Sequence, residues 1–508
     1  MELQIWHYVG YLLGLFFALE PSYIHPDEHF QSIEILMGKI QGIAGNIPWE
    51  FEPANSARSF VPLYLAYGPL LYLNKWLLHI QSPTAILYLL RIQNYIVFVF
   101  VSKLALQFLL QSKKERSKAD FFISTSYIVW CYQTHTFSNS LETVILLITL
   151  SLFKTLIQDS RDSKYQHYRT SVLIGFFVCL GIFNRITFPA FILLPCIPTM
   201  HKFYWHHWRS LMVCLFSFGL TSYLFVVADT WLYNSNTWCV APLNNFSYNM
   251  DESNLATHGL HPRYTHILFN VPQMLGPALI FFFSRRYKLA LPLLSCVSGL
   301  VTLSLFKHQE LRFLVPLLPL FCISIDLSNF DKVIKSEHVI KLWLLFNICL
   351  GIVMGGLHQR GVILAIDHLR TSSDTAGVHV WWKTYSPPTW MYMNKNLTIS
   401  TTNFVDGIEN VDKVDFNILQ NHVIDLKGCS VSLLNKTLSR LAESGSRDVL
   451  VIAPKSITNK VYGLENTSTF HFNSTWETKY SLDMDHFDIA DFTTFTPGMT
   501  IYEVTADA

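Results

Sequence analysis

Long apolar runs follow one another through the first 357 residues of this chain, and they constrain its fold more than any other feature. A helix that crosses the hydrocarbon core of a bilayer needs about 20 mostly apolar residues. We place runs of roughly this kind at 4–22, 85–110, 119–137, 140–157, 170–184, 187–200, 210–231, 266–283, 288–305, 312–326 and 341–357. Only 14% of the residues are charged, whereas soluble domains usually carry about 25%. The sequence therefore predicts an all-α polytopic membrane protein with about 11 transmembrane helices.

The segments between these runs fall into two classes that alternate along the chain. One class is rich in Lys and Arg, at 113–118, 154–169, 202–209, 285–288 and 332–341. The other class comprises 23–60, 137–140, 184–187, 234–265, 306–311 and the tail from 358. Basic loops stay on the cytosolic side, so we expect the second class and the C-terminus to be lumenal. Acceptor sites for N-glycosylation agree, because all of them fall in the second class: Asn245, Asn396, Asn435, Asn466 and Asn473.

The tail at 359–508 differs in character from the apolar part. Its hydrophobic segments are short, and RDVLVIAP at 447–454 has the composition of a buried strand followed by turn residues. We therefore expect two domains. The first, 1–358, is a transmembrane catalytic domain with a first lumenal loop at 23–60, and the second, 359–508, is a small lumenal α/β domain.

A dense polar cluster, HPDEHFQ at 25–31, follows the first apolar run. Pro26 suits the first position of a helix, which puts His25 at the N-cap and Asp27 and Glu28 in the first turn. There the helix dipole favours a charged carboxylate, the state that a general base requires. We expect the helix that follows, at 30–40, to be amphipathic and to lie flat on the membrane surface. Helix capping alone also explains these residues, so capping and catalysis remain two interpretations.

Other charged residues gather at the lumenal ends of the apolar runs. An arginine at the edge of the hydrocarbon is costly unless it is paired. An internal carboxylate or the phosphate of a lipid ligand would neutralise it. We therefore expect a cationic cradle for a phosphate-bearing lipid, with structural salt bridges as the alternative. The clusters contain Glu142, Arg185, His261, Arg263, Lys307, His308, Glu310, Arg312 and Arg360.

Histidines are frequent on the same side and raise the question of a bound metal. The candidates are His25, His29, His258, His261, His266 and His308. No HExxH or His-x-His ligand spacing occurs, so hydrogen-bonded histidines are the expectation and no metal site is predicted. The balance of 37 Lys and Arg against 36 Asp and Glu gives no indication of a nucleic-acid partner.

Six stretches, taken together and in order, are similar to a known enzyme family. They are HPDEHFQ at 25–31, TFSNSLET at 136–143, NRITFPAF at 184–191, ADTWLY at 228–233, HGLHPRYTH at 258–266 and HQELRFLVPLLPL at 308–320. Through them the chain, up to about residue 361, resembles the dolichyl-phosphate-mannose-dependent mannosyltransferases of glycosyltransferase family 22, in the GT-C superfamily. One departure is His135, which stands where many members have arginine.

The resemblance implies an inverting transfer of mannose in the endoplasmic reticulum lumen. The donor would be dolichyl phosphate mannose, the acceptor a mannose hydroxyl of a glycosylphosphatidylinositol (GPI) precursor, and the new linkage α1,2. No cofactor is implied beyond the lipid-linked donor. Asp27 would be the base, with Glu28 as the second candidate. The residues expected near donor or acceptor are His25, Glu142, Arg185, His261, Arg263, His308, Glu310 and Arg312, of which Arg185, Arg263, His308 and Arg312 would face the phosphate.

Within the family, the stretches at 241–266 and 358–362 most resemble the members that add the fourth mannose to the GPI core. Members that add the third mannose share the HPDE signature and are the second interpretation. A transporter and a non-catalytic subunit of a glycosylation complex are the non-enzyme alternatives. A transporter would favour charges in the middle of apolar runs and internal repeats, whereas here charges gather at the lumenal ends of the runs and no repeat is visible. Protein partners stay open.

Overall fold

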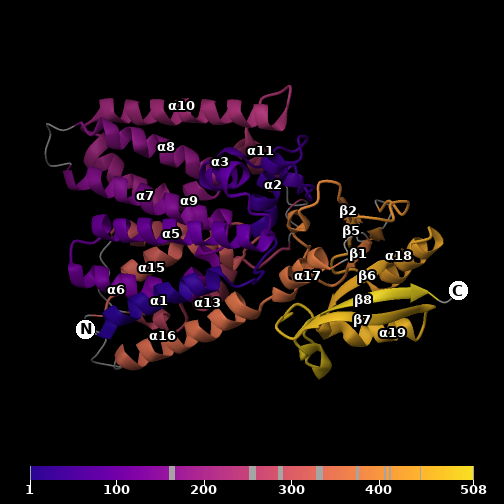
Figure 1. The fold of residues 1–508 in the computed structure, drawn as a ribbon. Helices are drawn as coiled ribbons and strands as arrows, with labels where there is room; N and C mark the ends of the chain where they lie inside the picture. Colours follow the sequence, from indigo (N-terminus) through magenta and orange to yellow (C-terminus); the bar gives the residue numbers. More distant parts are fainter. Residues whose placement is uncertain are drawn as a thin grey trace. The chain divides into compact units, whose positions relative to one another are not determined.

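The structure, a computed structural model, describes residues 2–159, 166–250, 254, 259–283, 290–327, 336–372, 377–405, 408–410, 414–446 and 448–506. The chain divides into two compact units. Unit 1 contains Met1–Leu19, Pro48–Leu70 and Leu90–Gly351, and unit 2 contains Glu20–Ile47, Leu71–Leu89 and Ile352–Ala508. The α-helices, drawn in Figure 1, are α1 (Glu2–Ala18), α2 (Glu34–Gln41), α3 (Val61–Ala66), α4 (Gly68–Leu73), α5 (Pro83–Leu109), α6 (Lys113–Ser124), α7 (Ser138–Asp159), α8 (Tyr168–Asn184), α9 (Phe188–Thr199), α10 (Trp208–Tyr233), α11 (Ala241–Met250), α13 (Val271–Leu275), α14 (Leu291–Ser304), α15 (Leu318–Ser324), α16 (Ser336–Leu350), α17 (Arg360–Thr371), α18 (Val431–Glu443) and α19 (Thr458–Glu465).

Unit 1 consists of helices that pack side by side. In Figure 1, α8 runs along α10 on one side and α7 on the other. Helix α9 packs against both α7 and α14. Gly175 explains the close approach of α8 to α10, because a Cβ atom there would lie 2.4 Å from the carbonyl oxygen of Cys214. Small residues serve this purpose in membrane helices, where close backbone packing stabilises the contact.

Four helices among the described residues are long and apolar enough to cross a membrane: Pro83–Leu109, Ser138–Asp159, Trp208–Tyr233 and Glu337–Leu357. Shorter apolar helices lie at Ile5–Ala18, Tyr168–Asn184, His266–Phe282, Leu291–Ser304 and Leu311–Ser324. The helical membrane architecture agrees with the sequence prediction, whereas the count of 11 spans stays a prediction. The predicted span 288–305 extends into residues outside the described ranges.

The predicted span 119–137 is not one continuous helix. α6 ends at Ser124, and a separate turn, η4 (Val129–Gln133), follows. The freed backbone groups are satisfied by side chains: the indole of Trp130 donates to the Ser124 carbonyl at 2.8 Å, and the Tyr127 amide donates to Asn347 Oδ1 at 2.7 Å. Such internal partners are what permit a helix break at membrane depth. Hydropathy alone could not reveal this break, because the residues on both sides of it are apolar.

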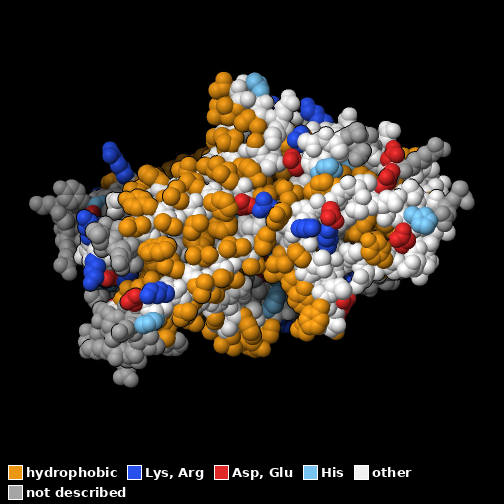
Figure 2. All heavy atoms as spheres, turned by 60° about the horizontal axis from the view of Figure 1, so that its bottom comes forward, with side chains coloured by type: hydrophobic (Ala, Val, Ile, Leu, Met, Phe, Trp, Pro, Cys, Tyr) orange, Lys and Arg blue, Asp and Glu red, His pale blue; other side chains and the backbone are white. Residues whose placement is uncertain are grey.

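The surface of the helical part is apolar. α10 is the clearest case, because only 6% of its most apolar window is buried, and Phe216 and Trp231 are 72% and 78% exposed. Figure 2 shows hydrophobic side chains crowding the helical region, with charged side chains gathered elsewhere on the same view. An apolar surface of this extent is stable in lipid rather than in water, which supports the assignment of a membrane protein.

The tail forms the α/β domain that the sequence predicts. Its strands are β1 (Val378–Trp381), β2 (Thr398–Thr401), β3 (Asn403–Val405), β4 (Ile408–Asn410), β5 (His422–Asp425), β6 (Val449–Pro454), β7 (Phe470–Thr478) and β8 (Met499–Ala506). Six of them make a mixed sheet in the order β2-β5-β1-β6-β8-β7, in which β8 runs antiparallel to both β6 and β7. The predicted strand at 447–454 is the fully buried β6, although Arg447 lies outside the described residues.

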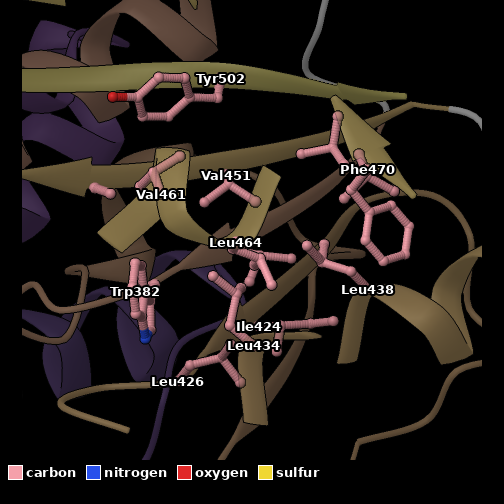
Figure 3. Packing of buried hydrophobic residues seen from close by; sticks show 14 of the residues in the cluster. Trp382, Ile424, Leu426, Leu434, Leu438, Val451, Val461, Leu464, Phe470 and Tyr502 are labelled. Carbon is pink, nitrogen blue, oxygen red and sulfur yellow. The ribbon is translucent and has the colours of Figure 1, made fainter. Parts of the chain in front are cut away.

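One hydrophobic core holds this sheet and its helices together. Leu434 and Leu438 on α18 and Val461 and Leu464 on α19 pack with strand residues such as Val451, as Figure 3 shows. α18 starts where the Ser430 hydroxyl accepts the Leu433 amide at 3.4 Å, which is the capping pattern preferred at helix N-termini. The C-terminal domain thus has a hydrophobic core of its own.

Unit 2 is larger than the predicted tail domain. It also takes up residues 20–47 and 71–89, so most of the predicted loop 23–60 packs with the C-terminal segment. The Ala44 amide, for example, donates to the Asn394 carbonyl at 3.1 Å. The polar cluster at 25–31 therefore belongs structurally to the unit that carries the sheet.

Candidate active site

Asp27 lies at the start of a helical segment, where its backbone amide donates to His25 Nδ1 at 3.2 Å. His25 is thus the cap that the sequence predicts. Gln31 Nε2 donates to Oδ2 of the carboxylate at 2.6 Å, and Oδ1 lies 3.5 Å from His25 Nδ1. The Asp27 side chain is 22% exposed, so a ligand can reach it. An oriented, accessible carboxylate has the geometry of a general base.

Glu28 lies next to Asp27 in sequence but in a different environment. Its side chain has no exposed surface, and Oε2 lies 3.8 Å from Nε2 of the equally buried His29. On the other side of the same ring, His29 Nδ1 accepts a hydrogen bond from the indole of Trp390 at 3.1 Å. The two acidic residues of the motif are therefore distinct: one faces outward and the other faces the protein interior.

The helix predicted at 30–40 forms as η1 (His29–Ile33) followed by α2, but it does not lie flat with a polar face in water. Gln31, Ser32 and Glu34 are buried together with the apolar residues between them. The reason is that the C-terminal segment covers this helix and supplies hydrogen bonds to its polar side chains.

Glu34 is a buried acid that the sequence interpretation did not select. Its Oε1 accepts from the Asn46 amide at 2.9 Å, from the Trp390 amide at 3.1 Å and from the Thr389 hydroxyl. Burial raises the pKa of Glu34 to about 7, against the lowering effect of these hydrogen bonds. A glutamate enclosed by apolar neighbours in Ile33–Met37 was the available sequence signal.

The raised pKa of Glu34 predicts a pH-dependent stability. From pH 4.5 to about 7 the folded state binds more protons than the unfolded chain. The free energy of unfolding should therefore fall as pH rises through this window, by roughly 3 kcal/mol, and be level above it. Glu34→Gln keeps an acceptor oxygen but buries no charge, so we expect it to abolish this dependence and to stabilise the protein at pH 8. Thermal unfolding in detergent from pH 4.5 to 8 measures both, with the exposed Glu52→Gln as control. A variant less stable than the parent at pH 8 would contradict the prediction.

In unit 1, Glu142 and Arg185 form a buried ion pair. Glu142 lies in the first turns of α7, and Arg185 directly follows α8. Arg185 Nε lies 3.3 Å from Glu142 Oε2, with 8% of the arginine side chain and none of the glutamate side chain exposed. Arg185 Nη1 also donates to Ser138 Oγ at 2.9 Å, and the Thr187 hydroxyl donates to Glu142 Oε1 at 3.0 Å. Arg185 therefore has the internal carboxylate that the sequence left open.

A second charged group in unit 1 is formed by His308, Glu310 and Arg312. Both neighbours contact Oε1 of Glu310: His308 Nε2 lies 2.8 Å from it, and Arg312 Nη2 donates to it at 3.0 Å. Burial lowers the pKa of His308, but the hydrogen bond to Glu310 and its charge outweigh burial, and the net effect is a raised pKa. The guanidinium carbons of Arg312 and Arg185 lie 5.4 and 5.3 Å from the centre of the same Phe313 ring. The structure thus brings both charged groups to one aromatic side chain.

The loop that carries His261 and Arg263 docks beside this group through its backbone. The His261 amide donates to the Lys307 carbonyl at 2.7 Å. Gln309, which is buried, donates its side chain to the Arg263 carbonyl at 3.2 Å. The side chains of His261 and Arg263 are exposed. Gln309 was not selected from the sequence, because a single glutamine between charged residues carries no distinguishing signal.

Two other arginines have internal partners. Arg360, which the sequence placed with the cationic clusters, pairs with Glu20 in unit 2. Arg58 was not predicted, yet it lies 3.3 Å from Glu50 and donates to the Asn184 carbonyl at 3.4 Å in unit 1. Among the described residues there is no cluster of three His, Cys, Asp or Glu side chains that could hold a metal. Of the other histidines considered, His266 is buried and His258 lies outside the described residues.

The five sequons differ in accessibility. Asn396, Asn466 and Asn473 are exposed, and Asn245 is half-buried on α11. Asn435 lies on α18, and the third residue of its sequon, Thr437, is buried and donates its hydroxyl to the Leu433 carbonyl at 2.8 Å. Glycosylation stays a prediction for all five.

The helical membrane fold with its C-terminal sheet has counterparts among solved structures. The crystal structure of ArnT from Cupriavidus metallidurans in the apo state matches with a TM-score of 0.55, at 10% sequence identity, over 98% of this chain and 97% of that chain. ArnT bound to undecaprenyl phosphate matches with a TM-score of 0.52, at 10% identity and the same coverage. At this identity the likeness concerns the fold alone.

The sequence comparisons are more specific. A model of the Alg9-like mannosyltransferase family matches residues 5–394. GPI mannosyltransferase 4 of Eremothecium gossypii is 48% identical, over 99% of this chain and 100% of that protein. GPI mannosyltransferase 4 of Saccharomyces cerevisiae is 44% identical, over 99% of both. The chain belongs to the Alg9-like mannosyltransferase family.

Proposed function

We propose that this protein is the α1,2-mannosyltransferase that adds the fourth mannose to the GPI-anchor precursor, with dolichyl phosphate mannose as donor. The observation that carries the proposal is 44–48% identity to GPI mannosyltransferase 4 of Saccharomyces cerevisiae and Eremothecium gossypii over nearly the full chain. The apolar helical surface supports lipid-linked substrates, because both donor and acceptor would reach the enzyme from the bilayer. The sequence pattern of basic loops supports a site on the lumenal side of the endoplasmic reticulum membrane.

In the proposed reaction the acceptor hydroxyl oxygen attacks C1 of the donor mannose. The bond from C1 to the phosphate oxygen breaks as the new bond forms, so the configuration at C1 inverts. The hydroxyl proton passes to Asp27, and dolichyl phosphate leaves with the bonding electrons. Asp27 suits the role of base better than Glu28, because its carboxylate is accessible and oriented, whereas Glu28 is enclosed.

The leaving phosphate needs cations, and the proposed groups are Arg185, Arg263, His308 and Arg312. Arg312 and Arg185 have carboxylate partners that hold their guanidinium groups in defined orientations. Arg263 is exposed, and His308 has a raised pKa that favours its charged form. The reaction as proposed needs no metal cofactor, because these cations would stabilise the phosphate directly.

A transfer assay tests the proposal. Purified protein in detergent receives labelled dolichyl phosphate mannose together with a GPI precursor that bears three mannoses, or one that bears two. We expect label only in the three-mannose lipid, in α1,2 linkage, with and without EDTA. Label only in the two-mannose lipid would assign the protein to third-mannose addition. If a folded protein with intact donor transfers mannose to neither lipid, the enzyme hypothesis is rejected. The transporter and the non-catalytic subunit then become the leading interpretations.

A further inference from the structure

A segment of the C-terminal domain contacts the acid-bearing motif at several points. The Tyr23 hydroxyl donates to the Ser386 carbonyl at 2.8 Å. The Tyr23 ring meets that of Tyr385 edge-on with centroids 5.6 Å apart, and it meets the His29 ring in the same way at 5.1 Å. Trp390 donates its backbone amide to Glu34 at 3.1 Å and its indole N–H to His29 at 3.1 Å. All these contacts lie within unit 2.

We infer that Trp390 is a positioning residue of the transfer reaction, acting through the ring of His29 on the adjacent carboxylates Glu28 and Asp27. The inference rests on the proposed role of Asp27 as base. It assigns a task in the reaction to the C-terminal domain: a side chain 361 residues away in sequence sets the state of the motif's second histidine.

The chemistry of the indole dictates how this works. An indole N–H can only donate, so His29 Nδ1 must be the acceptor and carries no proton while the bond exists. The proton of the neutral ring is then on Nε2, which lies 3.8 Å from Glu28 Oε2. A hydrogen bond to the neutral form of a histidine disfavours its charged form. Trp390 thus selects one tautomer of His29 and keeps an imidazolium from forming beside Glu28.

The charges around His29 make this control necessary. Glu28 Oε2 lies 3.8 Å from its Nε2, and the Tyr23 ring, which meets the His29 ring edge-on, is itself within electrostatic reach of Glu34, Glu28 and Asp425. A carboxylate as close to the ring as that of Glu28 would favour a charged histidine. An imidazolium at His29 would attract the Glu28 carboxylate and turn the first helical turn, from which Asp27 projects. Donation from Trp390 opposes that change.

The test removes the indole N–H. Trp390→Phe keeps an aromatic ring and the backbone bond to Glu34, and it loses part of the side-chain volume, a loss that the control variant shares. We expect a kcat lower by roughly 10-fold, the order of effect that outer partners of functional histidines have, with an unchanged KM for the donor. The acidic limb of the kcat–pH profile should move to higher pH, because His29 can now take a second proton. In a His29→Gln background the limb should stay at the parental position, and adding Trp390→Phe should change kcat by no more than about 2-fold.

Trp382→Phe is the matched control. Trp382 is also fully buried in the C-terminal domain and donates its indole N–H at 3.0 Å, but to the Cys429 carbonyl. The Trp382→Phe variant should be less stable than the parent, but its kcat–pH profile should not change. Equal kinetic losses in the two variants, or an acidic limb that Trp390→Phe leaves in place, would overturn the inference. Failure of the proposed base is read separately, from an Asp27→Asn enzyme that keeps its activity.

Discussion

Asp27→Asn should lower kcat for mannose transfer by roughly 10²–10⁴-fold while leaving KM for both lipids nearly unchanged. Asparagine has the size of aspartate, and its carbonyl oxygen can still accept the bond from Gln31 Nε2. It cannot take the proton of the attacking hydroxyl. The measurement is the rate of label transfer to the three-mannose lipid at saturating donor, with folding checked by thermal unfolding.

Two further carboxamide variants complete this prediction. Glu28→Gln should reduce kcat less than Asp27→Asn, because the Glu28 side chain is fully enclosed. Glu52→Gln changes an exposed residue further along the chain and should leave kcat at the parental value. If Glu28→Gln is the slower enzyme of the two, the base has to be reassigned to Glu28, and the motif must open to expose it.

The second large effect concerns the buried pair of unit 1. Arg185→Met should destabilise the protein by roughly 3–5 kcal/mol, because it leaves the Glu142 carboxylate buried without its cation. Glu142→Met should destabilise the protein by a similar amount, because it leaves the Arg185 guanidinium buried without its carboxylate. The double variant Glu142→Met/Arg185→Met should regain most of the stability, since apolar side chains of similar volume can replace a buried ion pair. Thermal unfolding in detergent measures all three.

The activity of the double variant then separates the two interpretations of Arg185. If Arg185 contacts the donor phosphate, the stable double variant should remain slow. If the double variant transfers mannose at the parental rate, the pair of Glu142 and Arg185 is structural and other cations bind the phosphate. Lys341→Met is the control for removing a cation, because its pair with Glu337 has both side chains 69% exposed and should be worth less than about 1 kcal/mol.

Much of the local organisation follows from the sequence because its signals are local. Hydropathy predicts the helical membrane segments. A continuous run of aliphatic residues predicts the strand at 449–454, which is buried in the structure. The cap at His25 depends on residues only two positions apart. The helix break after Ser124 was missed, since its compensating bond comes from Asn347, far along the chain. The membrane-surface helix at 30–40 was misjudged, because the segment that covers it begins more than 340 residues later.

The sequence by itself determined the class of protein, the family, the order of the apolar segments and the residues worth testing. The tertiary structure alone separated the accessible Asp27 from the enclosed Glu28, joined Glu142 to Arg185, and placed Trp390 on His29. The physical reason is that hydropathy and capping depend on neighbours along the chain, whereas the accessibility and protonation of a side chain depend on what packs against it from elsewhere in the fold.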